Sequence, residues 1–113
     1  MANSNVELLT QWKKELENEK TELRRQYDEY ERDLRLLNAK ISIASRASVK
    51  VGFGNRDDFQ EEIITPLEGQ LAEAEDELDE YTERYNKRLK YVNALLEEIN
   101  AVLPSGPKVK IER

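Results

Sequence analysis

The sequence predicts an all-α protein, an antiparallel two-helix hairpin of coiled-coil type with a structured tip between the helices. Charged residues make up 37% of the 113 residues and apolar ones 38%, a mixture typical of long amphipathic helices. Apolar side chains recur three or four residues apart along two long stretches, which is the spacing of one face of a helix. Glycine and proline gather between these stretches and after the second, where the chain must turn or stop.

The first helix is predicted from about residue 5 to residue 45. Ser4 is followed three residues later by Glu7, and these two residue types form a capping box in which each side chain satisfies a free backbone N–H. A seven-residue step in the apolar stripe leaves only Glu19 or Lys20 to face inward. The stripe consists of Leu9, Trp12, Leu16, Leu23, Tyr27, Tyr30, Leu34, Leu37 and Ile41.

Residues 46–64 are predicted to form the tip. This segment exceeds the roughly 2–8 residues that a helix–helix turn needs, and the excess includes several large apolar residues rather than polar filler alone. "SVKV", which begins at Ser48, could form a short edge strand, and Asp58 with Glu61 could cap a short helix. We expect the tip to close the hairpin and to offer a contact site for a partner, made by Val49, Val51, Phe53 and Phe59.

The second helix is predicted from about residue 65 to residue 103. Thr65 with Glu68 fits a capping box, and Pro66 would take the first helical position, where its missing N–H costs nothing. A new helix at Thr65 is therefore favoured over one helix that begins at Asp58 and kinks at Pro66. Its stripe consists of Leu67, Leu71, Ala74, Leu78, Tyr81, Tyr85, Leu89, Val92, Leu96, Ile99 and Leu103.

The tail, residues 104–113, completes what we expect to be a single domain. Pro104 and Pro107 end the helix, and "KVKIER" alternates basic and apolar residues, which is typical of a short strand or a frayed end. In a neighbouring copy this segment could add to the tip strand.

One antiparallel register aligns both stripes, because the numbers of facing residues then add to a nearly constant value. The aligned side chains also match in kind, with tyrosine opposite tyrosine and a large residue opposite a small one. The register predicts the facing pairs Leu16 with Leu96, Tyr30 with Tyr81, Leu34 with Leu78, and Leu37 with Ala74.

A second, partial apolar edge predicts self-association. A lone helical hairpin buries one stripe per helix, and small chains of this kind often need a further surface. The edge would dock a second copy into a four-helix bundle, which makes the chain a homo-oligomer; scattered exposed apolar side chains are the alternative interpretation. We place the edge at Leu36, Ile43, Tyr91 and Leu95.

Histidine and cysteine are both absent, which removes histidine-dependent and thiolate catalysis and the commonest zinc ligands. We therefore expect no catalytic, cofactor-binding or metal-binding residues, and no enzyme activity. The net charge of −6 argues against nucleic acid and against an anionic membrane as partners. No apolar run is long enough to cross a membrane, and the amino terminus lacks a secretory signal. These features are compatible with a cytoplasmic protein.

The function that these observations favour is a non-catalytic protein–protein interaction module. It would act as a small scaffold, adaptor, assembly or chaperone-like component, with a protein as its partner. The alternative is a small acidic inhibitor that occupies the basic, nucleic-acid-binding site of another protein. Its acidic face would lie within residues 73–83, at Glu73, Glu75, Asp76, Asp79 and Glu80.

Overall fold

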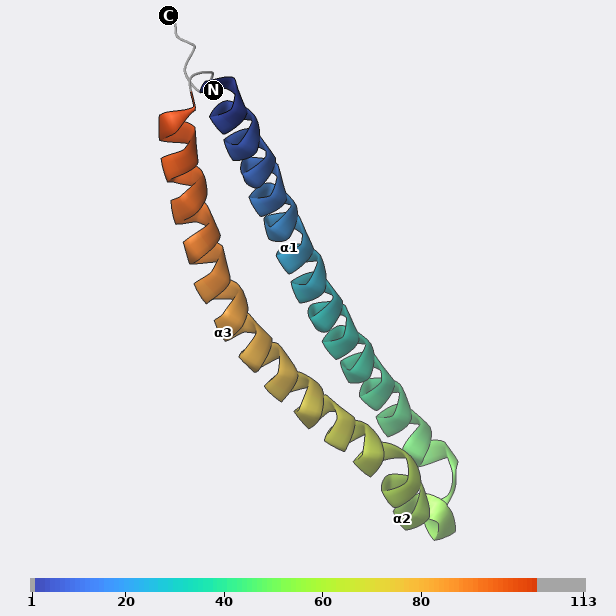
Figure 1. Ribbon diagram of the computed structural model, residues 1–113. Coiled ribbons are helices and arrows are strands. Elements are labelled where there is room, and N and C mark those ends of the chain that lie inside the picture. Colours follow the sequence, from blue (N-terminus) through green and yellow to red (C-terminus); the bar gives the residue numbers. More distant parts are fainter. Residues whose placement is uncertain (1, 104–113) are drawn as a thin grey trace, which may run out of the picture. The chain divides into compact units, whose positions relative to one another are not determined.

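Two long helices dominate the computed structural model, which describes residues 2–103 (Figure 1). Helix α1 spans Ala2–Ala47 and helix α3 spans Thr65–Val102. The tip between them holds two short 3₁₀ turns, helix α2 (Arg56–Phe59) and a π-helical turn. The described part of the chain contains no strand, so the predicted all-α helical hairpin is confirmed. No helix in this part is both long and apolar enough to cross a membrane.

The chain divides into two compact units. Unit 1 joins the start of α1, as far as Arg25, to the part of α3 from Arg84 onward. Unit 2 is the continuous segment Gln26–Glu83, which contains the end of α1, the tip and the start of α3. Each unit is thus a pair of antiparallel helical segments.

Unit 1 has an apolar core in which Val92 is fully buried. The core cluster consists of Leu16, Val92, Leu96, Ile99 and Leu103, with Val6, Leu9 and Leu95 packed against it. Because Leu16 and Leu96 share this cluster, the predicted register holds here. Glu19 takes the gap in the apolar stripe, where the Nε and Nη2 atoms of Arg88 donate hydrogen bonds to its two carboxylate oxygens, with 3.0 Å between Nη2 and Oε1.

Unit 2 follows the same register. The rings of Tyr30 and Tyr81 lie 5.0 Å apart between centroids, a distance typical of aromatic pairs. Leu37 and Ala74 line one groove, as their predicted pairing requires. Among the described residues of unit 2, only Ala44, Ile64 and Tyr81 are buried. The rest of its stripe is half-buried.

The boundaries of the long helices differ slightly from the prediction. Helix α1 begins at Ala2, three residues before the predicted start at about residue 5, so Ser4 lies inside the helix. Alanine has the highest helix propensity, and no proline or glycine precedes residue 5 to stop the helix. Helix α3 ends at Val102, and the backbone N–H of Leu103 still donates to Ile99. The predicted tail strand lies outside the described residues.

The prediction of a short edge strand at "SVKV" is wrong. Ser48–Lys50 forms a 3₁₀ turn directly after α1, and Phe53–Asn55 forms another. A strand is stable only when its backbone groups pair with a neighbour. No second strand exists in the described residues to pair with it, so local i→i+3 hydrogen bonds satisfy the backbone instead.

Helix α3 begins at Thr65, as predicted, but the predicted break in the helical backbone before it is absent. Helix α2, the π turn Gln60–Ile64 and α3 follow one another without interruption. Within a regular α-helix the ring of Pro66 would clash with the carbonyl four residues earlier. The π turn directly before it widens the backbone, and the N–H of Thr65 donates to the carbonyl of Gln60, five residues back. The helix therefore passes through the proline, and Thr65 is an interior residue.

The Glu19–Arg88 pair predicts an acid dependence of stability. The hydrogen bonds from Arg88 hold the pKa of the Glu19 carboxyl below its usual range. The pair's stabilisation should be complete above the unfolded-state value, roughly 4.3, and be lost as the pH falls through the lower folded value. Arg88→Gln should return the protonation midpoint of Glu19, followed by carboxyl NMR shifts, to the ordinary range.

The effect on the melting temperature at neutral pH should be small, because both side chains are partly exposed to solvent. Lys14→Gln removes the same charge from an exposed site of unit 1 and should leave the Glu19 midpoint unchanged. Equal midpoints in wild type and Arg88→Gln would contradict the pairing.

Candidate functional site

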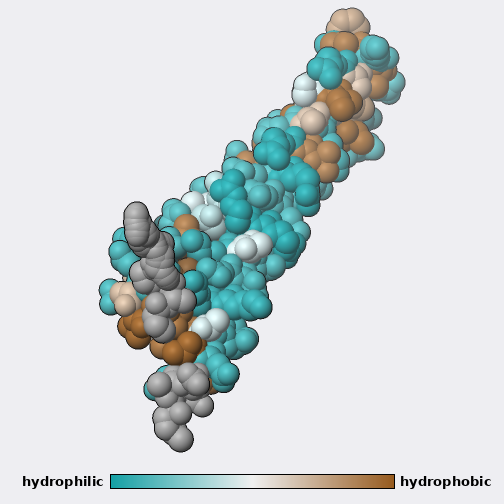
Figure 2. Space-filling model, turned by 90° about the horizontal axis from the view of Figure 1, so that it is seen from above, coloured by the Kyte–Doolittle hydropathy of each residue, from teal (hydrophilic) through white to brown (hydrophobic). Residues whose placement is uncertain are grey.

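The tip exposes a large apolar side chain to solvent. Phe53 is 90% exposed, and Val49 is also exposed. The Arg56 guanidinium carbon lies 5.2 Å from the centre of the Phe53 ring, which places a cation over the aromatic face. Figure 2 shows hydrophobic surface gathered at the tip end of unit 2, at the upper right of the view. Such a cluster is typical of a contact site for another protein.

An open groove of about 390 Å³ lies at the tip, and its lining includes Val51 and Asn55, the residues two positions before and two positions after Phe53. Val51 and Phe59 are its half-buried apolar residues, and Ile63 adds an exposed one. The whole lining consists of Val51, Asn55, Asp58, Phe59, Glu62 and Ile63. The groove therefore combines apolar walls with two carboxylates.

Local hydrogen bonds order the tip. The side-chain amide of Asn55 donates to the carbonyl of Val51 over 3.0 Å, and its backbone N–H donates to Gly52 over 3.1 Å. Gly52 has φ +91° and ψ 155°, a conformation that is essentially restricted to glycine. The Ser48 hydroxyl donates to the carbonyl of Ser45 over 2.7 Å. These local hydrogen bonds constrain the backbone of the tip at Ser48, Gly52 and Asn55.

The π turn brings a further residue into this site. Ile64 is buried, whereas the preceding Ile63 is exposed and lines the groove. Because π turns insert an extra residue into the helical repeat, they change which side chains face outward, and they occur often at functional sites. The apolar spacing of the sequence carries no sign of this turn.

The four predicted tip residues divide into two groups. Val51 and Phe59 line the groove, while Val49 and Phe53 are exposed outside its lining. Sequence reasoning did not select Ile63 or Arg56. Ile63 would have followed from counting apolar residues, but the placement of Arg56 over the Phe53 ring depends on the turn geometry at Gly52 and Asn55.

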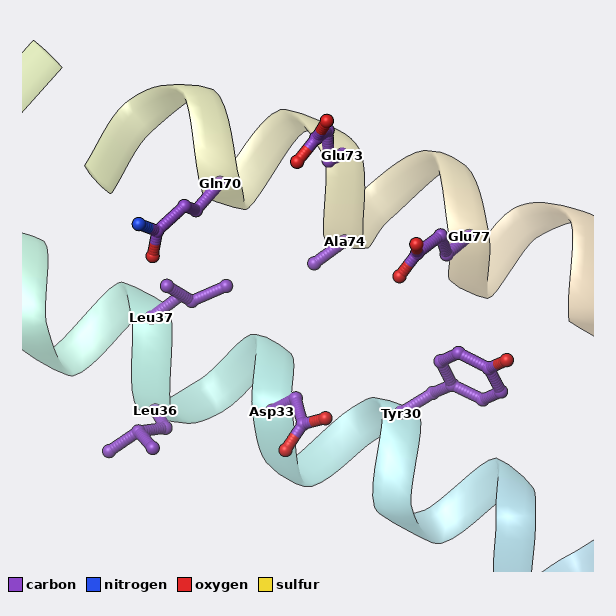
Figure 3. Close-up of a pocket in the computed structure, with 8 residues that line it drawn as sticks. All are labelled: Tyr30, Asp33, Leu36, Leu37, Gln70, Glu73, Ala74 and Glu77. Carbon is purple, nitrogen blue, oxygen red and sulfur yellow. The ribbon is translucent and has the colours of Figure 1, made fainter. Parts of the chain in front are cut away.

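A second groove, of about 280 Å³, lies between α1 and α3 within unit 2 (Figure 3). Figure 3 shows Leu37 reaching from α1 toward Ala74, while Leu36 points away from α3. Glu77 and Gln70 extend from α3 toward α1. The lining consists of Tyr30, Asp33, Leu36, Leu37, Gln70, Glu73, Ala74 and Glu77. The small side chain of Ala74 opposite Leu37 leaves this hollow open.

The other predicted surfaces are mostly exposed. Every residue of the predicted acidic face is exposed: Glu73, Glu75, Asp76, Asp79 and Glu80. Leu36, Ile43 and Tyr91 of the predicted self-association edge are exposed too, whereas Leu95 is half-buried against the core of unit 1. In the described part of the chain, no group of acidic side chains is arranged to hold a metal ion.

Comparison with models of protein families, with curated proteins and with solved structures finds no match to the chain. The geometry of the tip and of the grooves therefore carries the functional inference alone.

Gly52 offers a test of the tip conformation. Gly52→Ala should destabilise the fold by about 1–3 kcal/mol, because an alanine at this φ is strained. The matched control is Gly54→Ala, where the new methyl group also meets open space but φ is not positive. The control should be neutral or slightly stabilising. Equal unfolding free energies of the two variants in urea titrations would contradict a glycine-specific turn.

Proposed function

We propose that this protein is a non-catalytic interaction module that binds a partner protein with its tip. It would serve as a small scaffold, adaptor, assembly or chaperone-like component. The observation that supports this proposal is the exposure of Phe53, 90% of whose surface faces solvent, on an ordered turn beside an apolar groove.

The energetics favour a binding role for this ring. Removing a phenylalanine side chain from water contributes about 1.5–3 kcal/mol, and the folded chain leaves this contribution unused at Phe53. Aromatic anchors dominate many interfaces. Because hydrogen bonds at Asn55 and Ser48 already hold the tip, binding would order little additional backbone.

The charges around the tip define the chemistry of its partner. Four carboxylates follow Phe53 within one helical stretch: Asp57, Asp58, Glu61 and Glu62. All four are exposed, and Asp58 and Glu62 line the groove. The complementary surface is an apolar pocket that receives the Phe53 ring and carries basic side chains on its rim.

Substituting Phe53 tests the proposal. The immobilised chain is exposed to a lysate of its source cells, and bound proteins are identified by mass spectrometry and then purified for calorimetry. Phe53→Ser should weaken binding of the purified partner at least about tenfold. The melting temperature should not change, because the side chain is almost fully exposed.

Val102→Ser is the matched control, since it removes an exposed apolar side chain from unit 1. Its partner affinity should equal that of the wild type. Full affinity of the Phe53→Ser variant would exclude the tip as the binding site.

Unit 2 also supports a second candidate function, that of an acidic inhibitor. This unit carries sixteen acidic and six basic side chains, a net charge of −10. The exposed residues of the predicted acidic face belong to it. Such a surface is suited to occupy a basic groove that otherwise binds nucleic acid, with fast association that weakens at high salt.

A fourfold charge reversal separates the two functions. Changing Glu75, Asp76, Asp79 and Glu80 to lysine should abolish partner binding if the acidic face carries it, and should leave binding intact if the tip does. The control reverses the same number of exposed carboxylates in unit 1, namely Glu7, Glu15, Glu17 and Glu98. Binding that survives the unit 2 reversal, measured by calorimetry, rules out the inhibitor.

A further inference from the structure

The groove between α1 and α3 is a gap in the packing of the core of unit 2. Leu37 and Ala74 form its apolar floor, and Leu36, which is 53% exposed, lies at its edge. Asp33, Glu73 and Glu77 add three carboxylates to the lining. Within the described residues, these carboxylates form no ion pair. An apolar hollow bordered by uncompensated negative charge fits an apolar or aromatic side chain that has cations beside it.

The same chain carries a surface of that kind in unit 1. Tyr91 on α3 is 49% exposed. Lys87 lies four residues before it, on the same face of the helix, and Lys90 directly precedes it; both lysines are exposed. Lys87 thus places a positive charge on the same face as the aromatic ring, while Lys90 lies on a neighbouring face of the helix. The hydroxyl of the ring can donate a hydrogen bond to a carboxylate.

The charges of the two units decide how two copies would meet. Unit 2 has a net charge of −10, whereas the described part of unit 1 carries nine basic and seven acidic side chains. Contact between the unit 2 surfaces of two copies would oppose ten negative charges with ten more. Contact between unit 2 and unit 1 opposes charges of unlike sign, which favours association and fixes its orientation.

We propose that the groove of unit 2 binds unit 1 of a second copy of this chain, with Tyr91 as the inserted side chain. The ring covers Ala74 and Leu37, and its hydroxyl donates to one of the groove carboxylates. Lys87 provides a cation that offsets part of the negative charge of Glu73 and Glu77. The contact joins two different surfaces. Two copies that each insert Tyr91 into the groove of the other form a closed dimer, whereas copies that each bind the next one form an extended chain.

This site is independent of the tip. It uses Leu36 and Tyr91 of the predicted self-association edge, while Leu95 contributes to the core of unit 1 instead. The proposal therefore does not rest on the proposed function, and Phe53→Ser should leave self-association unchanged.

The absence of cysteine allows a direct test by disulfide cross-linking. Ala74→Cys and Ala94→Cys are made as separate variants, mixed and oxidised, and the linked peptides are identified by mass spectrometry. Ala94 is exposed and lies three residues after Tyr91, on the same face of α3, so this pair keeps the Tyr91 ring. A disulfide requires Cα atoms within about 7 Å, so a 74–94 link between two chains shows that the groove and the Tyr91 face meet. Leu8→Cys, at an exposed apolar position of unit 1, replaces Ala94→Cys in the control and should yield little link.

Solution measurements test the same contact without cross-linking. Sedimentation of the wild type from low to high micromolar concentration should show reversible association that weakens with salt. Ala74→Phe fills the groove, and Lys87→Glu replaces the positive charge beside Tyr91 with a negative one. Each variant should weaken association at least about tenfold. Circular dichroism should show an unchanged helical fold, and Lys14→Glu, an exposed lysine elsewhere in unit 1, should associate like the wild type.

Two results would overturn the proposal. The first is a wild type that stays monomeric at high micromolar concentration, which leaves the groove to a basic helix of a different protein. The second is association that persists in both Ala74→Phe and Lys87→Glu, combined with a 74–94 link no stronger than that of the control, which places the contact on another surface. A mixture of two charge-reversed variants adds a rescue test. One variant carries Lys87→Glu and the other carries both Glu73→Lys and Glu77→Lys, and the mixture should associate more tightly than either variant alone.

Discussion

A pair of antiparallel helices can bury only one stripe of side chains per helix, and the other features of this protein follow from that constraint. Unit 1 meets it with an aliphatic cluster around the fully buried Val92. Unit 2 meets it less completely, because tyrosines and Ala74 occupy its stripe and leave a hollow. Apolar side chains beyond the stripe have no third element to cover them. Exposed residues such as Leu36 and Tyr91 are the direct consequence.

The π turn in the tip allows a helical backbone to contain Pro66. Pro66 cannot donate a backbone hydrogen bond and would collide with the preceding turn of a regular α-helix. The π turn at Gln60–Ile64 relieves that conflict and keeps the helix continuous. It also leaves Ile64 buried and Ile63 exposed. The π turn that accommodates Pro66 therefore also places Ile63 in the lining of the tip groove, the region of the proposed contact site.

The long-range features could be predicted from the sequence, while the local ones could not. Helical periodicity and register follow from the spacing of many apolar residues, so the facing of Tyr30 with Tyr81 was predictable. The 3₁₀ turn at Ser48–Lys50 depends on the absence of a partner strand, which no single segment reveals. The π turn precedes Pro66 in a helix that continues through the proline, and the apolar spacing does not indicate it. The groove at Ala74 required the register and the side-chain sizes together.

Charge then separates the roles of the remaining surfaces. The helical stretch after Phe53 concentrates carboxylates beside an aromatic anchor, and the start of α3 carries more of them along an exposed face. A surface with net charge of −10 repels its own copy. The two proposed partners of unit 2, a basic foreign protein and the more basic unit of the same chain, both avoid this repulsion. The groove between α1 and α3 and the Phe53 ring lie on different elements of unit 2. The two proposed kinds of binding therefore need not exclude each other, because a second copy in the groove would leave the Phe53 ring available to a partner protein.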